Sequence, residues 1–181
     1  MNIQSFAQHR RMQGFTMIEL IVVIVILGIL AAVALPRFTG IQRDARVAKL
    51  NAARGALQAA SGMIHGAALA RAGQGAVTIG TCVATTTATG GGSVCTESGP
   101  ITLVNFYPAA TLAGIVNAAG LVSTSPPTAA LLAAEGYATA GAGPITIEVT
   151  GGTAAATCSF IYTAAVAGSA PVISAVTTTG C

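Results

Sequence analysis

Residues 15–35 form the feature that most limits what this chain can fold into. Their sequence is FTMIELIVVIVILGILAAVAL, in which Glu19 is the single ionisable residue. A helix of this length is about 31 Å long, which matches the roughly 30 Å hydrocarbon core of a bilayer. The segment therefore predicts a membrane-crossing helix, with Arg10 and Arg11 as its cytoplasmic flank.

Charged residues are few, and they lie mainly in the first part of the chain. They make up 7% of the sequence, against roughly 25% in an average soluble domain. All eight Lys and Arg residues lie at or before Arg71, and all four cysteines lie after it. The second part therefore lacks the clustered cations that nucleic-acid binding needs. Arg and Lys residues also follow the apolar segment and favour a cytoplasmic second part, but the cysteines favour an oxidising compartment, and we give the cysteines more weight.

Three interpretations of the apolar segment compete. It is a secretory signal cut after the small residues 32–34, an uncut signal anchor, or a helix exposed when a short leader, residues 1–14, is removed. Glu19 bears on the choice, because a carboxylate in an apolar helix costs a few kcal/mol and usually has a functional partner. A cut between Gly14 and Phe15 would create an ammonium group one helical turn away. The structural alternative is that Glu19 snorkels to the lipid headgroups.

The sequence Gly14-Phe15-Thr16-Met17-Ile18-Glu19-Leu20, followed by the apolar run, resembles the leader and N-terminal motif of type IV pilins and pseudopilins. The resemblance implies that a prepilin peptidase cleaves after Gly14 and methylates the amine of Phe15. It also implies that Glu19 acts in assembly. Gly28 and Pro36 lie where such pilins carry helix-weakening residues, which implies a stretch that extends when the subunit enters a filament.

Residues 37–72 continue as a predicted amphipathic helix. Small and apolar residues recur there at steps of three and four: Phe38, Ile41, Ala45, Ala48, Ala52, Ala56, Ala59, Met63 and Ala67. We expect this stripe to cover a small domain and to pack against other helices in a filament core, with the neighbouring charges solvated. Gly73 and Gly75 are the expected stop.

Residues 77–181 predict a small antiparallel sheet packed on the second half of the helix, which makes the fold class α+β. The strand candidates are residues 77–79, 101–104, 145–149, 158–162 and 172–176, and the short helix candidates are residues 109–121 and 128–134. We expect the Gly90–Gly91–Gly92 stretch to be a flexible loop, since no phosphate-binding motif follows it.

The four cysteines allow three disulfide pairings. The sequence-local pairing, Cys82 with Cys95 and Cys158 with Cys181, is favoured over zinc binding, because the chain has no Cys-x-x-Cys pair. We expect no metal and no cofactor. We also expect no enzymatic activity, because no His or Lys follows Arg71 to activate a hydroxyl group. His65 is expected to be structural.

A finer resemblance, to the mannose-sensitive haemagglutinin (MSHA) pilin subfamily, rests on residues 34–38, 42–46, 55–61, 105–110 and 158–181. It implies the main subunit of a surface pilus for adhesion and biofilm attachment. The implied partners are other copies in a helical filament, the prepilin peptidase/N-methyltransferase and the inner-membrane assembly machinery. The implied location is the inner membrane, with the second part periplasmic, and later an extracellular pilus. A type II secretion pseudopilin and a minor pilin are the alternatives, with an uncut signal-anchored binding module as the alternative of another class.

Overall fold

The computed structural model describes residues 15–181, so the expected leader, residues 1–14, lies outside the described residues. The chain divides into two compact units, Met1–Ile41 and Gln42–Cys181, and each is described here by itself. Helix α1 (Met17–Arg71) supplies the described structure of the first unit and the first element of the second. The long N-terminal helix and the antiparallel sheets confirm the predicted α+β class.

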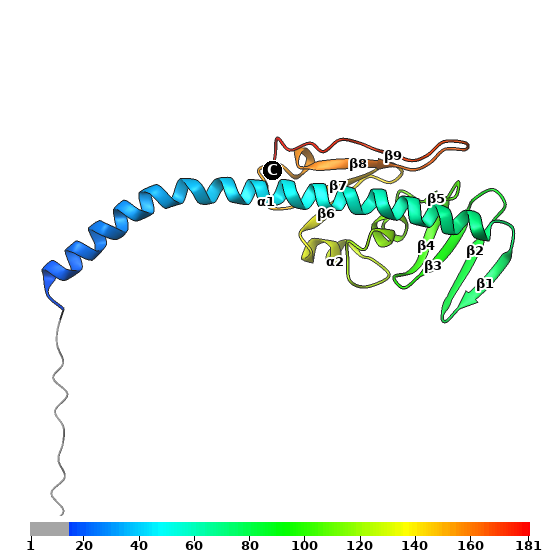
Figure 1. Cartoon of the computed structure of the whole chain (residues 1–181), viewed down its shortest axis with the longest axis horizontal. Helices are drawn as coiled ribbons and strands as arrows, with labels where there is room; N and C mark the ends of the chain where they lie inside the picture. The colour runs from blue at the N-terminus through cyan, green and yellow to red at the C-terminus, as the bar shows by residue number, and fades with distance from the viewer. Residues whose placement is uncertain (1–14) are drawn as a thin grey trace, which may run out of the picture. The chain divides into compact units, whose positions relative to one another are not determined.

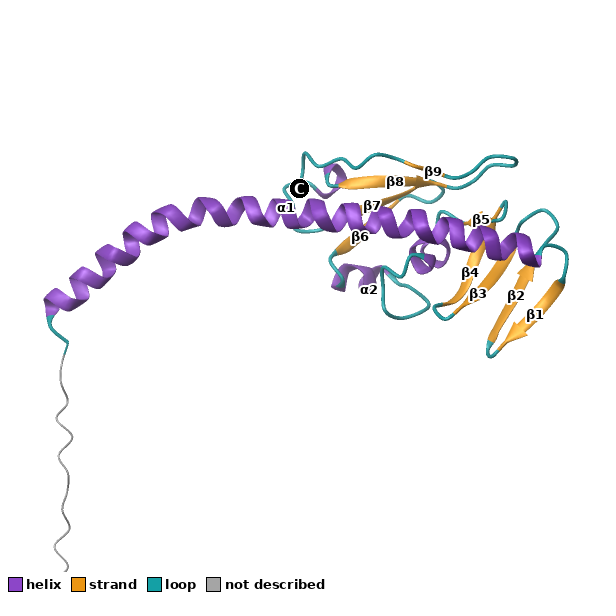
Figure 2. Cartoon of the chain, viewed as in Figure 1, coloured by secondary structure: helices purple, strands orange, loops and turns teal. Residues whose placement is uncertain are grey.

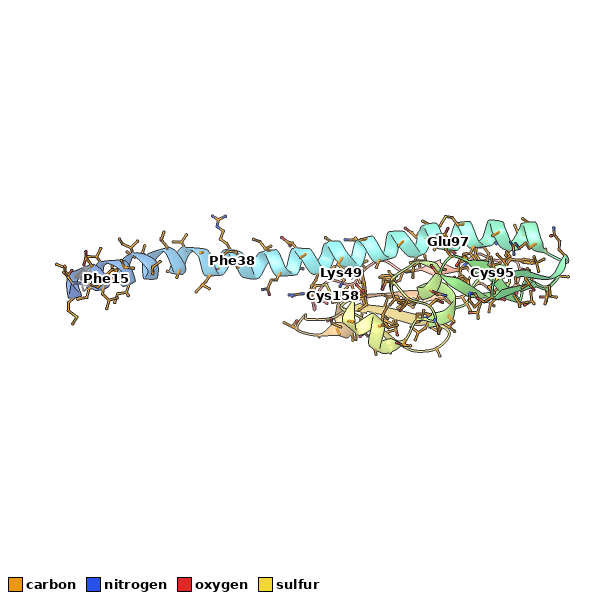
Figure 3. The ribbon with its side chains drawn as sticks, turned by 90° about the horizontal axis from the view of Figure 1, so that it is seen from below. Phe15, Phe38, Lys49, Cys95, Glu97 and Cys158 are labelled. Carbon is orange, nitrogen blue, oxygen red and sulfur yellow. A yellow bond between two sulfur atoms is a disulfide. The ribbon has the colours of Figure 1, made fainter. Side chains whose placement is uncertain are left out.

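The first unit exposes an apolar helix on all sides. From Met17 to Ile41 its large apolar side chains are about half or more exposed, and they extend outward around the ribbon (Figure 3). Among the described residues, α1 is the one helix long and apolar enough to cross a membrane. Its first half therefore has no core of its own to cover its Ile, Val and Leu side chains.

The second unit contains two antiparallel sheets where the sequence predicted one (Figures 1 and 2). The five-stranded sheet has the order β1 (Gly75–Ile79), β2 (Cys82–Thr86), β3 (Gly92–Thr96), β4 (Gly99–Val104) and β5 (Tyr107–Pro108). The four-stranded sheet has the order β6 (Tyr137–Ala140), β7 (Ile145–Val149), β8 (Ser159–Thr163) and β9 (Val172–Ile173). Neighbouring strands in each sheet follow one another along the chain, so both sheets are simple meanders. The expected strand at 172–176 is shorter than predicted, and Gly92 is the first residue of β3 rather than part of a loop.

The second half of α1 joins the two sheets into one packed unit. Leu50, Ala53 and Leu57 belong to a core with the β6–β9 sheet, whereas Ile64 and Ala68 belong to a core with the β1–β5 sheet. The two sheets accordingly lie at successive positions along the helix, β6–β9 first and β1–β5 nearer its end (Figure 1). Both sheets therefore pack against the same helix face.

The alanine stripe predicted to cover the domain is not the covering face. Most of its members in the second unit are exposed: Ala45, Ala48, Ala52, Ala59 and Met63. Leu50, Leu57 and Ile64 form a second apolar series with similar helical spacing, and they are at most 5% exposed. Because burial is favourable in proportion to apolar area, the series with larger side chains faces the sheets. The prediction was right about a packed helix and wrong about its face.

Two shorter helices connect the sheets, where the sequence predicted helices at 109–121 and 128–134. The first is a five-residue π-helix, η1 (Leu112–Val116), within which Gly114 has non-helical backbone angles. A Cβ atom at Gly114 would lie 2.1 Å from the Ala109 carbonyl oxygen, so glycine permits this close approach. The second helix, α2 (Ala129–Ala134), begins after Thr128, whose hydroxyl oxygen accepts a hydrogen bond from the Leu131 amide.

Both disulfides have the sequence-local pairing. Cys82 at the start of β2 is bonded to Cys95 in β3, and Cys158 before β8 is bonded to Cys181. The Cys158–Cys181 bond belongs to the larger core cluster, where Cys158 is fully buried. One disulfide therefore joins two strands of the first sheet, and the other holds the last residue of the sequence against the second sheet.

Candidate assembly site

Thr16 and Glu19 form a reciprocal helix cap at the start of α1. The Thr16 amide and hydroxyl donate hydrogen bonds of 2.9 and 2.8 Å to Oε2 of Glu19, and the Glu19 amide donates one of 3.3 Å to the Thr16 hydroxyl oxygen. This is a capping box, in which a Thr and a Glu three residues later satisfy each other's backbone donors. The Thr-x-x-Glu spacing was visible in the sequence, but sequence reasoning considered Glu19 only as an ion-pair or snorkelling group.

Phe15 lies directly before this cap and is 88% exposed. Together with Ile18, Glu19, Val22 and Val23 it lines an open, mostly apolar groove of about 400 Å³. One edge of this apolar surface therefore carries a single carboxylate. Such a surface can receive another apolar helix and one cationic group.

The two predicted helix-weakening positions lie inside α1. The helix runs without a break through Gly28 and Pro36. A Cβ atom built at Gly28 would have no neighbour within 4 Å, so packing within the chain does not require a glycine there. The described conformation is thus fully helical at both positions.

The basic residues on the second half of α1 bind the rest of the second unit. The Arg46 and Arg54 Nε atoms donate hydrogen bonds of 2.6 and 2.8 Å to the backbone oxygens of Cys181 and Ser174. Arg43 Nη2 donates one of 3.4 Å to the Thr178 carbonyl. Lys49 Nζ bonds the Glu135 carbonyl and lies 4.3 Å from the centre of the Tyr137 ring; Figure 3 labels this lysine on the helix. The expectation of solvated charges was therefore wrong for Arg46, Lys49 and Arg54, which are partly buried and attach segments 135–137 and 174–181 to the helix. Arg43 and Asp44 are exposed, as expected.

His65 has a structural environment. Its ring stacks on the Tyr107 ring with centroids 3.9 Å apart, and its Nδ1 atom lies 3.2 Å from the Phe106 carbonyl oxygen. Nearby, the fully buried Tyr162 donates a 2.7 Å hydrogen bond to the Pro108 carbonyl, and burial raises the pKa of its hydroxyl to about 12. These contacts connect β5 to α1 and to β8.

Of the residues singled out from the sequence, Phe15 and Glu19 lie close together, whereas Gly28 and Pro36 lie further along α1. Phe15 and Glu19 meet at the start of α1, next to Thr16. The four cysteines form the two disulfides. Within residues 15–181, no group of three or more His, Cys, Asp or Glu residues could hold a metal ion.

Two comparisons with known proteins bear on the class of protein, and one of them falls on the N-terminal region. Residues 9–35 match the family model described as the prokaryotic N-terminal methylation motif. The chain is also 48% identical, over 50 residues, to the type IV narrow pilus major component PilA5 of Thermus thermophilus. That alignment covers 28% of this chain and 43% of the relative, so the chain spans less than half of the relative's length. No solved structure matches the chain.

These similarities support a type IV pilin, a structural class rather than an enzyme class. Neither comparison identifies the MSHA subfamily.

Proposed function

We propose that this chain is the structural subunit of a type IV pilus and polymerises through the first half of α1. One observation carries the proposal: an uncovered apolar helix begins with a single capped carboxylate, inside a segment that matches an N-terminal methylation motif. The pilus component similar to this chain supports the same conclusion.

Processing is the first step of the proposed mechanism. A prepilin peptidase removes residues 1–14 between Gly14 and Phe15, and the new N-terminus of Phe15 is methylated. Before assembly, residues 15–36 span the inner membrane and the 77–181 domain lies in the periplasm. The high exposure of Phe15 is compatible with access by a processing enzyme.

Glu19 then sets the position of each subunit along the filament. Its carboxylate pairs with the Phe15 ammonium group of a neighbouring copy as the helix leaves the lipid. The two cap bonds that the carboxylate accepts both use Oε2, and a carboxylate accepts about four hydrogen bonds, so the cap and the pair between subunits can coexist. Because a buried charge is costly without a partner, this pairing favours one axial register.

In the assembled pilus, the apolar helices form the core and the 77–181 domains form the surface. Gly28 and Pro36 let the helix extend locally when the subunit enters the filament, since both residues weaken helices. The finished filament is extracellular and serves adhesion and biofilm attachment, as the resemblance to the MSHA subfamily implies.

N-terminal sequencing and mass spectrometry of filaments sheared from cells test this proposal. We expect a subunit that begins with N-methylated Phe15. Gly14→Ser is expected to block cleavage and leave the subunit at its precursor mass. Filaments that contain the full precursor, or a chain cut after residues 32–34, would contradict the proposal. A product found only in the periplasm would favour the pseudopilin alternative.

A further inference from the structure

Strand β1 leaves the five-stranded sheet incomplete at one edge. It is the outermost strand, paired with β2 on one side, and no element lies beyond it in Figure 2. All five of its residues are exposed. Its outer side therefore presents unpaired backbone N–H and C=O groups, which are a template for another strand.

The edge also carries an uncovered apolar surface. Val77 and Ile79 are 39% and 47% exposed. Val77 lies opposite Ala84, which is 2% exposed, so Val77 is on the same side of the sheet as the buried residues. Ile79 shares that side because side chains alternate along a strand. The side of the sheet that faces the core at β2 therefore extends onto β1, where its side chains are exposed.

Nothing in β1 protects this edge. Soluble proteins protect exposed edges with Lys, Pro, bulges or inward-pointing charges. The strand sequence is Gly-Ala-Val-Thr-Ile, and the nearest charged residues along the chain are Arg71 and Glu97. An unprotected edge of this kind is typical of a surface that a partner covers.

The β1–β2 hairpin is also held against β3 before any partner binds. The β2–β3 ladder contains two residue pairs, Thr85 with Ser93 and Thr86 with Gly92. The Cys82–Cys95 disulfide adds a covalent link where this ladder has ended, next to the β1–β2 turn. A pre-ordered edge loses less conformational entropy on binding, which favours association.

We propose that β1 docks an extended segment of a second copy of this chain, which adds to the sheet as a further strand. The proposed filament favours this partner, because other copies surround each 77–181 domain, and residues 72–96 carry no charge that would attract an acidic or basic molecule instead. The inference rests on the proposed filament, in which each subunit presents β1 to a different surface of the next, as helical repetition requires.

Photo-crosslinking in filaments tests this contact directly. A photoreactive phenylalanine analogue replaces Ile79 in the full chain and, as a matched control, Val83. Val83 belongs to the same hairpin, lies on the opposite side of the sheet and is 48% exposed. We expect position 79 to give a product of twice the subunit mass, whose peptides both derive from this chain, and position 83 to give much less.

A charge test complements the crosslinking. The double variant Val77→Lys/Ile79→Lys is expected to lower the yield of sheared filaments at least about tenfold, because a charge buried against the docked segment without a partner is costly. Val83→Lys is the matched control and is expected to keep the yield. Mass spectrometry of each purified subunit checks that both disulfides are intact.

The outcomes separate the two proposals. If the unmodified chain forms no filaments, the proposed function is contradicted. If it forms filaments but position 79 crosslinks only to lipid or another protein, or to nothing, the β1 contact alone is contradicted. Filament yield that is unchanged in the double lysine variant contradicts it as well.

Discussion

The two halves of α1 are both helical, but different surroundings make them so. From Met17 to Ile41 the large Ile, Val and Leu side chains are exposed, whereas residues 42–71 bury one face against two sheets. β-Branched residues have low helix propensity in water, so the first half depends on lipid or other helices for its stability. Apolar character alone therefore does not distinguish a core from an assembly surface. The two differ in whether other residues of the same chain bury the apolar side chains.

The strongest test of this contrast is Glu19→Ala, which changes the first half alone. We expect it to abolish filaments, since the subunit loses its partner for the Phe15 ammonium group. The free energy of unfolding of the second unit is expected to change by less than about 0.5 kcal/mol. Immunoblots of the sheared fraction and denaturant unfolding of the full chain in detergent measure the two effects.

Thr16→Ala is the control for Glu19→Ala, because it removes the capping bonds of the Thr16 hydroxyl and retains the carboxylate. It is expected to destabilise the helix end by about 0.5–2 kcal/mol and to permit filaments. Normal filament numbers from Glu19→Ala would contradict the proposed pairing.

Removing the Cys158–Cys181 disulfide tests the stability of the second unit, which includes the second half of α1. The double variant Cys158→Ala/Cys181→Ala is expected to lower the free energy of unfolding by about 2–5 kcal/mol. Membrane insertion of the first half should be unaffected. Thermal unfolding and membrane fractionation measure the two properties, and an unchanged melting temperature would show that the bond contributes little to the second unit.

A pair of substitutions within α1 tests which helix face is covered. Leu57 is fully buried and Met63 is 68% exposed. We expect Leu57→Ala to cost about 2–5 kcal/mol and Met63→Ala to stay within about 0.5 kcal/mol. Denaturant unfolding of both variants decides between the observed face and the alanine stripe. Equal losses would contradict the assignment of the covered face.

The smallest expected effect comes from Tyr162→Phe. It leaves the buried Pro108 carbonyl without its donor and is expected to cost about 1–2 kcal/mol. Because burial raises the pKa of Tyr162 from 10.0 to about 12, the folded state favours the protonated hydroxyl. Its contribution is complete below pH 10 and is lost as the pH rises from 10 to 12. The free energy of unfolding measured across this range should fall more steeply for the wild type than for the Phe variant.

Local patterns predicted the elements with strong signals. The apolar run predicted the first half of α1, and the β-branched sequence Ile-Thr-Ile-Glu-Val at 145–149 predicted β7, because both carry a hydrophobic pattern typical of their element. The helix predicted at 128–134 similarly matches α2 within one residue.

Elements that depend on distant partners were missed. Strands β2, β3 and β6 are rich in Thr, Ala and Gly, so their conformation follows from pairing in the sheets rather than from their own sequence. The covered face of α1 was misassigned because Leu50 and Ala45 belong to two competing series with similar spacing. At the candidate site, Glu19 was found from its cost in lipid, whereas its cap with Thr16 was missed.

The cations of α1 have a consequence for behaviour in acid. Arg43, Lys49 and Arg54 hold the domain through the main-chain carbonyl oxygens of Thr178, Glu135 and Ser174, which do not gain protons in the range where carboxylates do. Many proteins unfold in acid because paired carboxylates become neutral. In this chain these three attachments of the helix require no ionised acid. A filament surface built from such subunits should therefore keep them when its surroundings become acidic.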